Sequence, residues 1–279
     1  MSAPPVAERR GWRPTPFLLA SAGVHAAALS SLVISRAWAV PLAAVAANHL
    51  VIGAACMNPR GGWLGPNLTR IPVARARNQI ALTFDDGPDP AVTPQVLDLL
   101  EQAGARATFF CLGERAAHHA GLIADIRDRG HGVENHTHRH PNTFALSGAA
   151  AMRREVVQAQ DSIEQTAGRR PQFFRAPAGM LNPWLFPILA AAGLSLVSWT
   201  RRGFDTTSSS SATVASRLTR GLAAGDILLL HDGYASTRRR DPGVVIDALA
   251  RVLDAMQKLQ LRSEALHRLL PAASRDPSA

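Results

Sequence analysis

From residue 78 onward, short apolar runs alternate with segments of helical periodicity, and this alternation constrains the fold more than any other feature. The apolar runs read QIALTF, ATFFC, HGVEN, QFFR, LSLVSW and DILLLH. Between them, Met152, Val156 and Ile163 recur at the spacing of an amphipathic helix, as do apolar residues of the segment 245–256. Strands that alternate with helices predict parallel βα units, so we expect an α/β layer or barrel.

The length of the chain removes any need for disulfide bonds. With 279 residues it can form one large domain or two small ones. A domain of about 200 residues buries roughly 70% of the surface of its unfolded chain. Cys56 and Cys111 lie in separate apolar segments, so we expect two unpaired thiols, which leave the redox compartment open.

Two apolar segments, residues 17–35 and 37–57, precede the alternating region and are separated by Arg36. Each is close to the roughly 20 residues that span a bilayer, so we expect two membrane helices joined by a very short turn. A cleaved signal peptide fits less well, because its apolar part usually has roughly 7–15 residues. Buried helices of a soluble protein are the third interpretation.

Arginines flank these segments asymmetrically. They are Arg9, Arg10 and Arg13 before the first segment and Arg60, Arg70, Arg75 and Arg77 after the second. By the positive-inside rule, a hairpin that spans twice leaves both flanks and the body of the protein in the cytoplasm. If only one segment spans, the body lies on the other side of the membrane.

The predicted organisation has five parts. They are a basic N-terminal tail (1–16), membrane-anchoring helices (17–57), a linker (58–77) with Trp63 as an interface anchor, an α/β domain (78–268) and a disordered tail (269–279). The net charge of +9 comes almost entirely from arginine and suits anionic lipid or acidic glycan, although scattered arginines also fit a solvated surface. Because no basic stripe is interleaved with aromatic residues, we do not expect nucleic-acid binding, and the oligomeric state is open.

Polar residues follow nearly every predicted strand. In a parallel α/β barrel, reactive residues lie at the carboxyl ends of the strands. The residues at these positions are Asp85, Asp86, His136, Arg175, Asp205 and His231. Five strand ends that all carry such groups are hard to assign to chance, and we expect an active site there.

The spacing of the histidines points to a metal. His136 and His140 are four residues apart and would share one face of a helical turn, whereas His138 would face away. Of the adjacent Asp85 and Asp86, one could ligate the metal while the other stays free as a base, although DDGPDP also fits a simple turn. Two imidazoles and one carboxylate match a catalytic zinc site, and cobalt, nickel or manganese would accept the same set.

Five motifs of this region resemble those of the polysaccharide deacetylase family, also known as the NodB-homology domain or carbohydrate esterase family 4. In the family's order they read TFDDGP (83–88), HTHRH (136–140), RAPAG (175–179), WTRRGFDT (199–206) and LLLHDG (228–233). The resemblance covers about residues 78–265. It implies a distorted (β/α) barrel, usually of seven strands, and metal-dependent removal of N- or O-acetyl groups from sugars.

The resemblance also implies which residues bind the metal and act as base. Asp86, His136 and His140 would hold one divalent ion, with zinc the first choice. Asp85 would take a proton from the metal-bound water, and Arg175 would pair with Asp85 and orient it.

The same resemblance assigns the acid and the pocket. His231 would protonate the leaving amine, and Asp205 would tune it. The backbone N–H of Ala178 would help to hold the oxyanion, while Leu229 and Pro177 would line the substrate pocket. These assignments predict a membrane-anchored enzyme of the bacterial inner membrane that acts on an acetylated glycan or a lipid-linked sugar.

Three positions depart from the family pattern and leave the substrate open. Ala178 stands where motif three usually has an aromatic residue, Arg202 replaces a frequent acidic residue, and Thr206 replaces a tryptophan. A wider and more basic cleft would suit an anionic or lipid-linked sugar. Two alternatives stay open: a hydrolase of a non-sugar amide, and an inactive glycan-binding protein, which should have lost at least one catalytic residue, whereas all are present.

Overall fold

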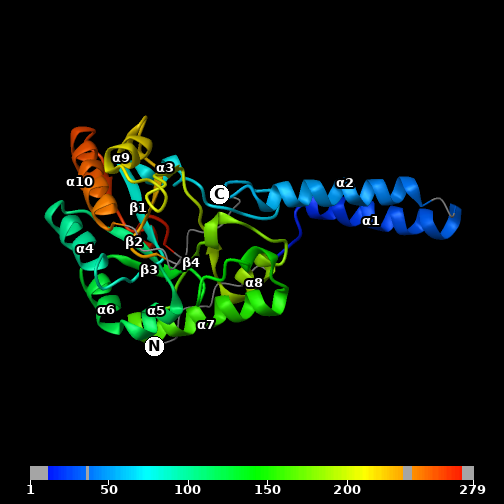
Figure 1. Ribbon diagram of the computed structural model, residues 1–279, viewed down its shortest axis with the longest axis horizontal. Coiled ribbons are helices and arrows are strands. Elements are labelled where there is room, and N and C mark those ends of the chain that lie inside the picture. Colours follow the sequence, from blue (N-terminus) through cyan, green and yellow to red (C-terminus); the bar gives the residue numbers. More distant parts are fainter. Residues whose placement is uncertain (1–11, 36–37, 235–240, 272–279) are drawn as a thin grey trace, which may run out of the picture.

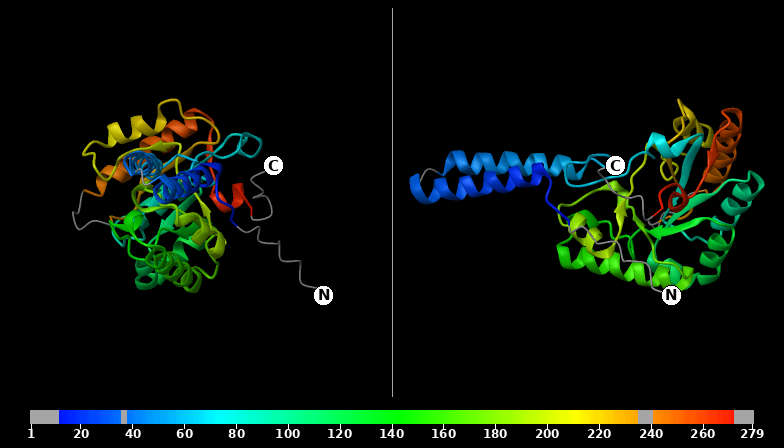
Figure 2. Two further views of the ribbon diagram at one scale, coloured as in Figure 1. Left: turned by 90° about the vertical axis from the view of Figure 1, so that its right-hand side faces the viewer. Right: turned by 180° about the vertical axis from the view of Figure 1, so that it is seen from behind.

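A parallel β-sheet that curls into a half-barrel forms the centre of the protein (Figures 1 and 2). In this computed structural model the described residues are 12–35, 38–234 and 241–271, so Arg9, Arg10, Arg36 and most of the expected C-terminal tail lie outside them. The strands are β1 (Gln79–Asp85), β2 (Ala107–Cys111), β3 (Gly132–Asn135), β4 (Phe173–Phe174), β5 (Ser195–Leu196), β6 (Arg201–Arg202) and β7 (Ile227–His231). Their order is β5-β4-β3-β2-β1-β7-β6, which confirms the expected seven-stranded α/β barrel-like fold. An additional short strand, β8 (Arg262–Ser263), pairs with the beginning of β1.

Helices cover the outer face of this sheet (Figure 1). They are α4 (Thr93–Gln102), α5 (Gly113–His118), α6 (Ala120–Asp128), α7 (Ala149–Ala167), α8 (Leu185–Ala192), α9 (Ser211–Thr219) and α10 (Gly243–Lys258). Two short helices, α3 (Val73–Ala76) and α11 (Leu266–Leu269), instead contribute to the core inside the curl. The helical periodicity predicted from the sequence is confirmed, because Met152, Val156 and Ile163 form the buried face of α7. In α10, Val245 and Val252 are likewise buried against the sheet.

The register of the central strands brings their carboxyl ends together. Asp85 at the end of β1 is aligned with His231 at the end of β7 and with Phe110 of β2. Alternate residues of β1 pack on opposite faces, since Leu82 lies in the core beneath the helices and Ala81 in the core inside the curl. Burial on both faces explains why these strands read as continuous apolar runs.

Helices α1 (Pro16–Ser35) and α2 (Ala39–Cys56) lie side by side and project from the domain as a hairpin (Figures 1 and 2). Both are long and apolar enough to cross a membrane, and only 11% of each apolar window is buried. Leu29, Val33 and Leu50 are exposed along the hairpin. A hydrogen bond of 2.8 Å from Asn48 Nδ2 to Ser21 Oγ joins the two helices.

The base of the hairpin is packed onto the domain. Ala55 near the end of α2 and Leu64 share an apolar core with residues of α8 such as Leu185. The following segment runs beside the β5 edge, where the Leu68 N–H donates to the Leu196 carbonyl at 3.0 Å. The residues between hairpin and sheet are therefore fixed against the edge of the half-barrel.

Candidate active site

The polar residues predicted at strand ends converge at the carboxyl edge of the sheet. Asp85 and His231 are the last residues of β1 and β7, while His136 and Arg175 directly follow β3 and β4. Asp205 follows β6, and all five side chains are buried. The curl of the sheet brings His136 and Arg175 to β1 from one side and His231 from the other.

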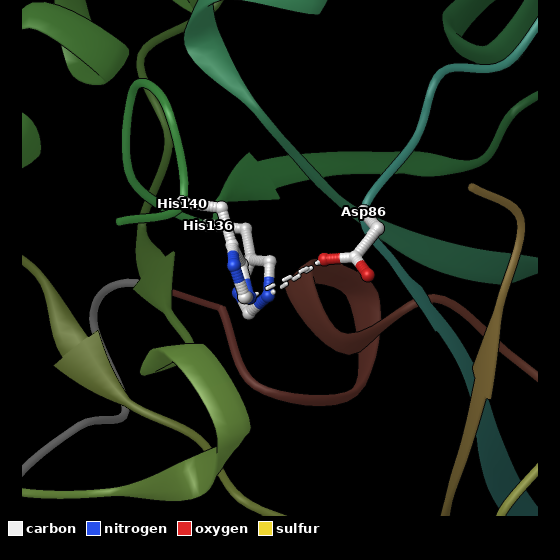
Figure 3. Close-up of side chains that lie close together, drawn as sticks. All are labelled: Asp86, His136 and His140. Atoms are coloured by element: carbon white, nitrogen blue, oxygen red, sulfur yellow. Dashed lines mark ion pairs between the residues drawn. The ribbon is translucent and has the colours of Figure 1, made fainter. Parts of the chain in front are cut away.

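Asp86, His136 and His140 form a cluster whose ligand atoms all lie within 4.8 Å of one another (Figure 3). Asp86 Oδ1 lies 3.3 Å from His136 Nε2 and 3.6 Å from His140 Nε2. For a tetrahedral ion with ligands at about 2.1 Å, the ligand atoms lie about 3.4 Å apart. The separations in the cluster therefore fit one small divalent ion.

The hydrogen bond of His136 also suits metal binding. His136 Nδ1 lies 2.8 Å from the Arg175 carbonyl oxygen. Because a carbonyl can only accept, Nδ1 carries a proton, which leaves Nε2, the nitrogen that faces Asp86, as the atom that can ligate a metal. Metal-binding histidines are commonly oriented in this way by their second ring nitrogen.

The histidines lie on a loop, so the expected helical turn is wrong. Thr137 and His140 have left-handed φ angles of 71° and 54°. The loop is held by Glu155 of α7, whose carboxylate accepts from the His138 and Arg139 N–H groups at 3.0 and 2.8 Å. The His138 ring packs beside Gly113 and is not a member of the metal cluster found among the described residues.

Asp85 and Arg175 form a buried ion pair next to this cluster. Arg175 Nη1 donates to Asp85 Oδ1 and to Thr83 Oγ1, both at 2.7 Å, and Nη2 donates to the Ser198 carbonyl at 2.8 Å. The guanidinium also lies 4.1 Å from the centre of the Phe110 ring. These contacts fix the orientation of the Asp85 carboxylate, whose second oxygen, Oδ2, lies 3.9 Å from His136 Nε2.

His231 and Asp205 form the second buried pair. Asp205 Oδ1 lies 3.0 Å from His231 Nδ1, and Asp205 Oδ2 accepts from the His231 backbone N–H at 2.7 Å. Burial alone would lower the pKa of His231, but the charge and hydrogen bond of Asp205, with Asp86 and Asp85, raise it to about 9. His231 is thus a proton donor at neutral pH.

The cluster residues are electrostatically coupled. Burial alone would raise the pKa of Asp86, but its hydrogen bond with His136 and the charges of the neighbouring histidines hold it below its usual value. Burial likewise opposes protonation of His136, yet Asp85 and Asp86 raise its pKa, whereas burial and the charge of His136 lower the pKa of His140. Since a metal ligand must be neutral imidazole, a cation bound here would compete with a proton for His136.

The residues predicted to line the pocket occupy different environments. Ala178 is exposed in a short 3-10 turn (Pro177–Gly179) and has a left-handed φ of 54°. Pro177 is buried in the same turn, and Leu229 is buried in β7. The substrate roles of these three residues stay predictions.

Asp232, which follows His231 in motif five, is a buried residue of the site to which the sequence assigned no chemical role. Its carboxylate accepts from Thr93 Oγ1 at 2.7 Å, and burial raises its pKa to about 7. A Cβ at Gly87 would lie 2.2 Å from Asp232 Oδ2, so only glycine fits in motif one beside this carboxyl. Nothing in the local sequence indicates this burial, because Thr93 is 139 positions away.

Arg115 is a second residue that sequence analysis missed. Its Nη1 donates to the Asp86 carbonyl at 2.9 Å, and its Nη2 donates to the Tyr234 carbonyl at 2.7 Å. Arg115 therefore ties the loop after β1 to the loop after β7. Such a contact positions Asp86 and His231 relative to each other.

The fold and the site together define a class of protein. A parallel half-barrel carries at its strand ends a two-histidine, one-aspartate cluster flanked by Asp85–Arg175 and by His231–Asp205. Such a set combines a cation site with a carboxylate and an imidazole, the groups that hydrolysis of an amide or ester requires. This arrangement is typical of a hydrolase.

Comparisons with known proteins identify the family. A family model described as polysaccharide deacetylase matches residues 73–197. A peptidoglycan-N-acetylglucosamine deacetylase of Bacillus cereus is 33% identical over 210 residues, covering 75% of this chain and 92% of the relative. A chitooligosaccharide deacetylase of Bradyrhizobium sp. is 34% identical, covering 64% and 84%. A family 4 carbohydrate esterase from Streptomyces lividans superposes with a TM-score of 0.62 at 31% identity, covering 68% of this chain and 94% of that structure.

The chain belongs to the polysaccharide deacetylase family, carbohydrate esterase family 4. It is a hydrolase of carbon–nitrogen bonds other than peptide bonds, in keeping with the named deacetylases that it resembles. The resemblance of its five motifs to this family, seen in the sequence, is confirmed.

Proposed function

We propose that this protein removes N-acetyl groups, or O-acetyl groups, from a glycan or a lipid-linked sugar in a metal-dependent reaction. The observation that carries the proposal is the placement of the Asp86–His136–His140 cluster beside Asp85, at the strand end where Asp85 is aligned with His231. Asp85 can accept a proton and His231 can donate one, so the protein has a group for each of the two proton transfers of amide hydrolysis.

Asp86, His136 and His140 are the residues that would hold the cation. When bound, a divalent ion polarises the acetyl carbonyl and lowers the pKa of water at the site, which supplies the electrophile and the nucleophile. The donor set of one carboxylate and two imidazoles suits zinc first, and also cobalt, nickel or manganese.

Asp85 serves in this proposal as the general base. Arg175 donates to one oxygen of its carboxylate, Oδ1, and the other, Oδ2, faces the cluster. A base fixed in this way accepts the proton of the attacking water without first reorienting. Arg175 is a positioning residue, because its guanidinium acts through Asp85 and lies fully buried.

His231 serves as the general acid for the leaving amine. Its proton on Nδ1 is shared with Asp205, so Nε2 is the atom that gives a proton to the departing nitrogen. The raised pKa keeps His231 charged before the transfer. The backbone N–H of Ala178 is assigned to the developing oxyanion, and Leu229 and Pro177 to the walls around the acetyl group.

We further propose that the domain is anchored to the bacterial inner membrane by α1 and α2. Both helices would span together, because they pack against each other and expose apolar side chains on their outer faces. Trp63, whose ring centre lies 5.4 Å from that of Phe17 at the hairpin base, would lie at the membrane–water interface. The arginines that flank the hairpin favour the cytoplasmic side for the catalytic domain, taken as 78–268 after the linker 58–77.

Acetate release from purified full-length protein tests the function. We would assay chitooligosaccharides, peptidoglycan fragments and lipid-linked N-acetylhexosamines with added divalent metals. Asp85→Asn should lose nearly all turnover yet keep its metal, whereas His136→Ala should lose both. Full activity of Asp85→Asn would refute the base assignment. If the metal-bound wild type released acetate from none of the sugars, a non-sugar amide would be favoured as the substrate.

A further inference from the structure

A groove lined by arginines lies at the edge of the sheet beside motif four. Its volume is about 520 Å³, and its walls come from β6 and α9. The lining residues are Thr200, Arg201, Arg202, Phe204, Arg217 and Arg220. Four guanidinium groups around one groove raise the question of what compensates their charge.

Of these four arginines, Arg201 has both a carboxylate partner and hydrogen-bond acceptors within the protein. It forms ion pairs and hydrogen bonds with the Asp226 carboxylate and with the Arg220 and Gly221 carbonyls. Among the described residues, neither Arg202, Arg217 nor Arg220 forms an ion pair with a carboxylate. Three like charges therefore lie along one groove without a carboxylate partner, which makes the groove attractive to an anion.

Arg202 is the most constrained of these three. Its guanidinium lies 5.3 Å from the Trp199 ring centre and 4.8 Å from the Phe204 ring centre. Its Nε is buried and has no hydrogen-bond acceptor in the part of the chain that the structure describes. Stacking between aromatic rings fixes the plane of the guanidinium while leaving its N–H groups for a ligand.

Phe204 supports two arginines at once. Its ring also lies 5.5 Å from the Arg217 guanidinium, and Arg217 donates to the Gly203 carbonyl at 3.3 Å. Phe204 is 44% exposed and has a left-handed φ of 60°, a conformation that is uncommon for a bulky residue. An aromatic ring held in this way is a preformed support for the two cations.

The groove adjoins the catalytic residues. Phe204 directly precedes Asp205, the partner of His231. Trp199, under Arg202, packs so closely on motif three that a Cβ at Gly179 would lie 2.4 Å from its ring. The groove therefore lies next to motifs three and four, which carry Ala178 and Asp205.

The groove also adjoins the base of the hairpin. Arg60, four residues after the end of α2, reaches the Thr200 carbonyl through Nη1 at 3.4 Å. Pro59 lies against Gly179 and accepts a hydrogen bond from Ser198. The segment that leaves the hairpin thus runs directly past the mouth of the groove.

We propose that this groove binds a phosphate group, and that the phosphate belongs to the substrate, a sugar joined through phosphate to a membrane lipid. Three uncompensated guanidinium groups match an anion with several acceptor oxygens and more than one charge better than a single carboxylate. The position between active site and hairpin base suits an anion at the membrane surface. This inference rests on the proposed deacetylase function and names its substrate class.

A matched pair of substrates tests the proposal in full-length protein in detergent. One is an N-acetylhexosamine joined to farnesyl through a phosphodiester, and the other is the same sugar joined to farnesol by a plain glycosidic bond. The wild type should have a kcat/KM at least about tenfold higher for the phosphodiester, and Arg202→Gln or Arg217→Gln should lower this ratio about tenfold, since each removes a charged hydrogen bond. Arg154→Gln is the control, because it removes an exposed arginine from α7, on the opposite side of the domain from α9 (Figure 1).

The outcomes separate the groove from the active site. Equal kcat/KM for the two substrates in the wild type, or an unchanged ratio in both groove variants, would overturn the phosphate site. A sugar 1-phosphate without lipid shows whether phosphate alone suffices; if it is processed as well as the farnesyl phosphodiester, the lipid part of the proposal is wrong. If the metal-bound wild type releases acetate from no substrate, the proposed deacetylase function is wrong. The groove is then tested by calorimetry, which compares the binding of farnesyl phosphate with that of farnesol. Equal binding of farnesyl phosphate by Arg202→Gln and the wild type would refute the phosphate site.

Discussion

Replacing Asp205 with asparagine should change the pH dependence of the enzyme more than its activity at low pH. Asp205 contacts His231 twice, through the imidazole Nδ1 at 3.0 Å and through the backbone N–H at 2.7 Å. Asparagine keeps the size of the side chain and one acceptor oxygen but removes the negative charge. The substitution therefore acts chiefly on the protonation of His231.

The magnitude follows from the pKa of His231, which is about 9 with Asp205 in place. At pH 8 such an imidazole is roughly 90% protonated, whereas one with an ordinary pKa near 6.5 is roughly 3% protonated. We expect kcat/KM of Asp205→Asn to be about 30-fold below the wild type at pH 8, but within about twofold at pH 6. A divalent cation nearby lowers the pKa of the imidazole in both enzymes, so at saturating metal the ratio of about 30 and the convergence of the two profiles are both reached at lower pH than these values.

The assay is acetate release over the range from about pH 5.5 to 9.5 at saturating metal, with kcat/KM plotted against pH because it reports the pKa values of the free enzyme. Asp161→Asn, on the exposed surface of α7, is the matched control and should reproduce the wild-type profile. If the ratio of wild type to Asp205→Asn is constant over the whole range, Asp205 acts only by holding His231 in place, and the reasoning from charge is wrong.

Three further predictions concern metal, stability and topology. His140→Ala should lose most of its bound metal by elemental analysis, whereas His138→Ala should keep it; equal metal content in both would contradict the ligand assignment. The pKa of His131 is lowered to about 4 by burial, with Nδ1 accepting from the Ala107 N–H at 3.1 Å. The unfolded chain binds this proton near pH 6.5, so stability should fall by roughly 3 kcal/mol as pH drops from 6.5 to 4, and urea unfolding of His131→Gln should show a correspondingly weaker pH dependence. If both α1 and α2 span the membrane, a fluorescent protein fused to the C-terminus should fluoresce and an alkaline phosphatase fused there should be inactive. The reverse pattern would refute the cytoplasmic orientation.

The sequence predicted the fold class and the members of the site because both depend on local patterns. Alternating apolar runs and amphipathic segments define the strands and helices, and parallel strands place their carboxyl ends at one edge. Asp85, His136 and His231 could therefore be assigned to one site without knowledge of the register. The apolar composition of 17–57 likewise indicated the hairpin, since length and hydropathy are properties of the segment alone.

Contacts between distant residues decided the rest. A spacing of four fits both a helical turn and a loop, and it is Glu155 on α7 that holds the loop bearing His136 and His140. Asp232 could not be assigned to the site from the sequence, because its burial against Thr93 has no local signal.

The two arginines of β6 show the same limit most clearly. Arg201 and Arg202 are adjacent and chemically identical, and nothing in the sequence distinguishes them. In the structure Arg201 pairs with Asp226, whereas Arg202 lies close to the rings of Trp199 and Phe204. The sequence by itself determined which chemical groups the protein possesses and roughly where along the fold they stand. Their burial, partners and pKa values were decided only by the tertiary structure, because these properties arise from contacts between segments that are far apart in the chain.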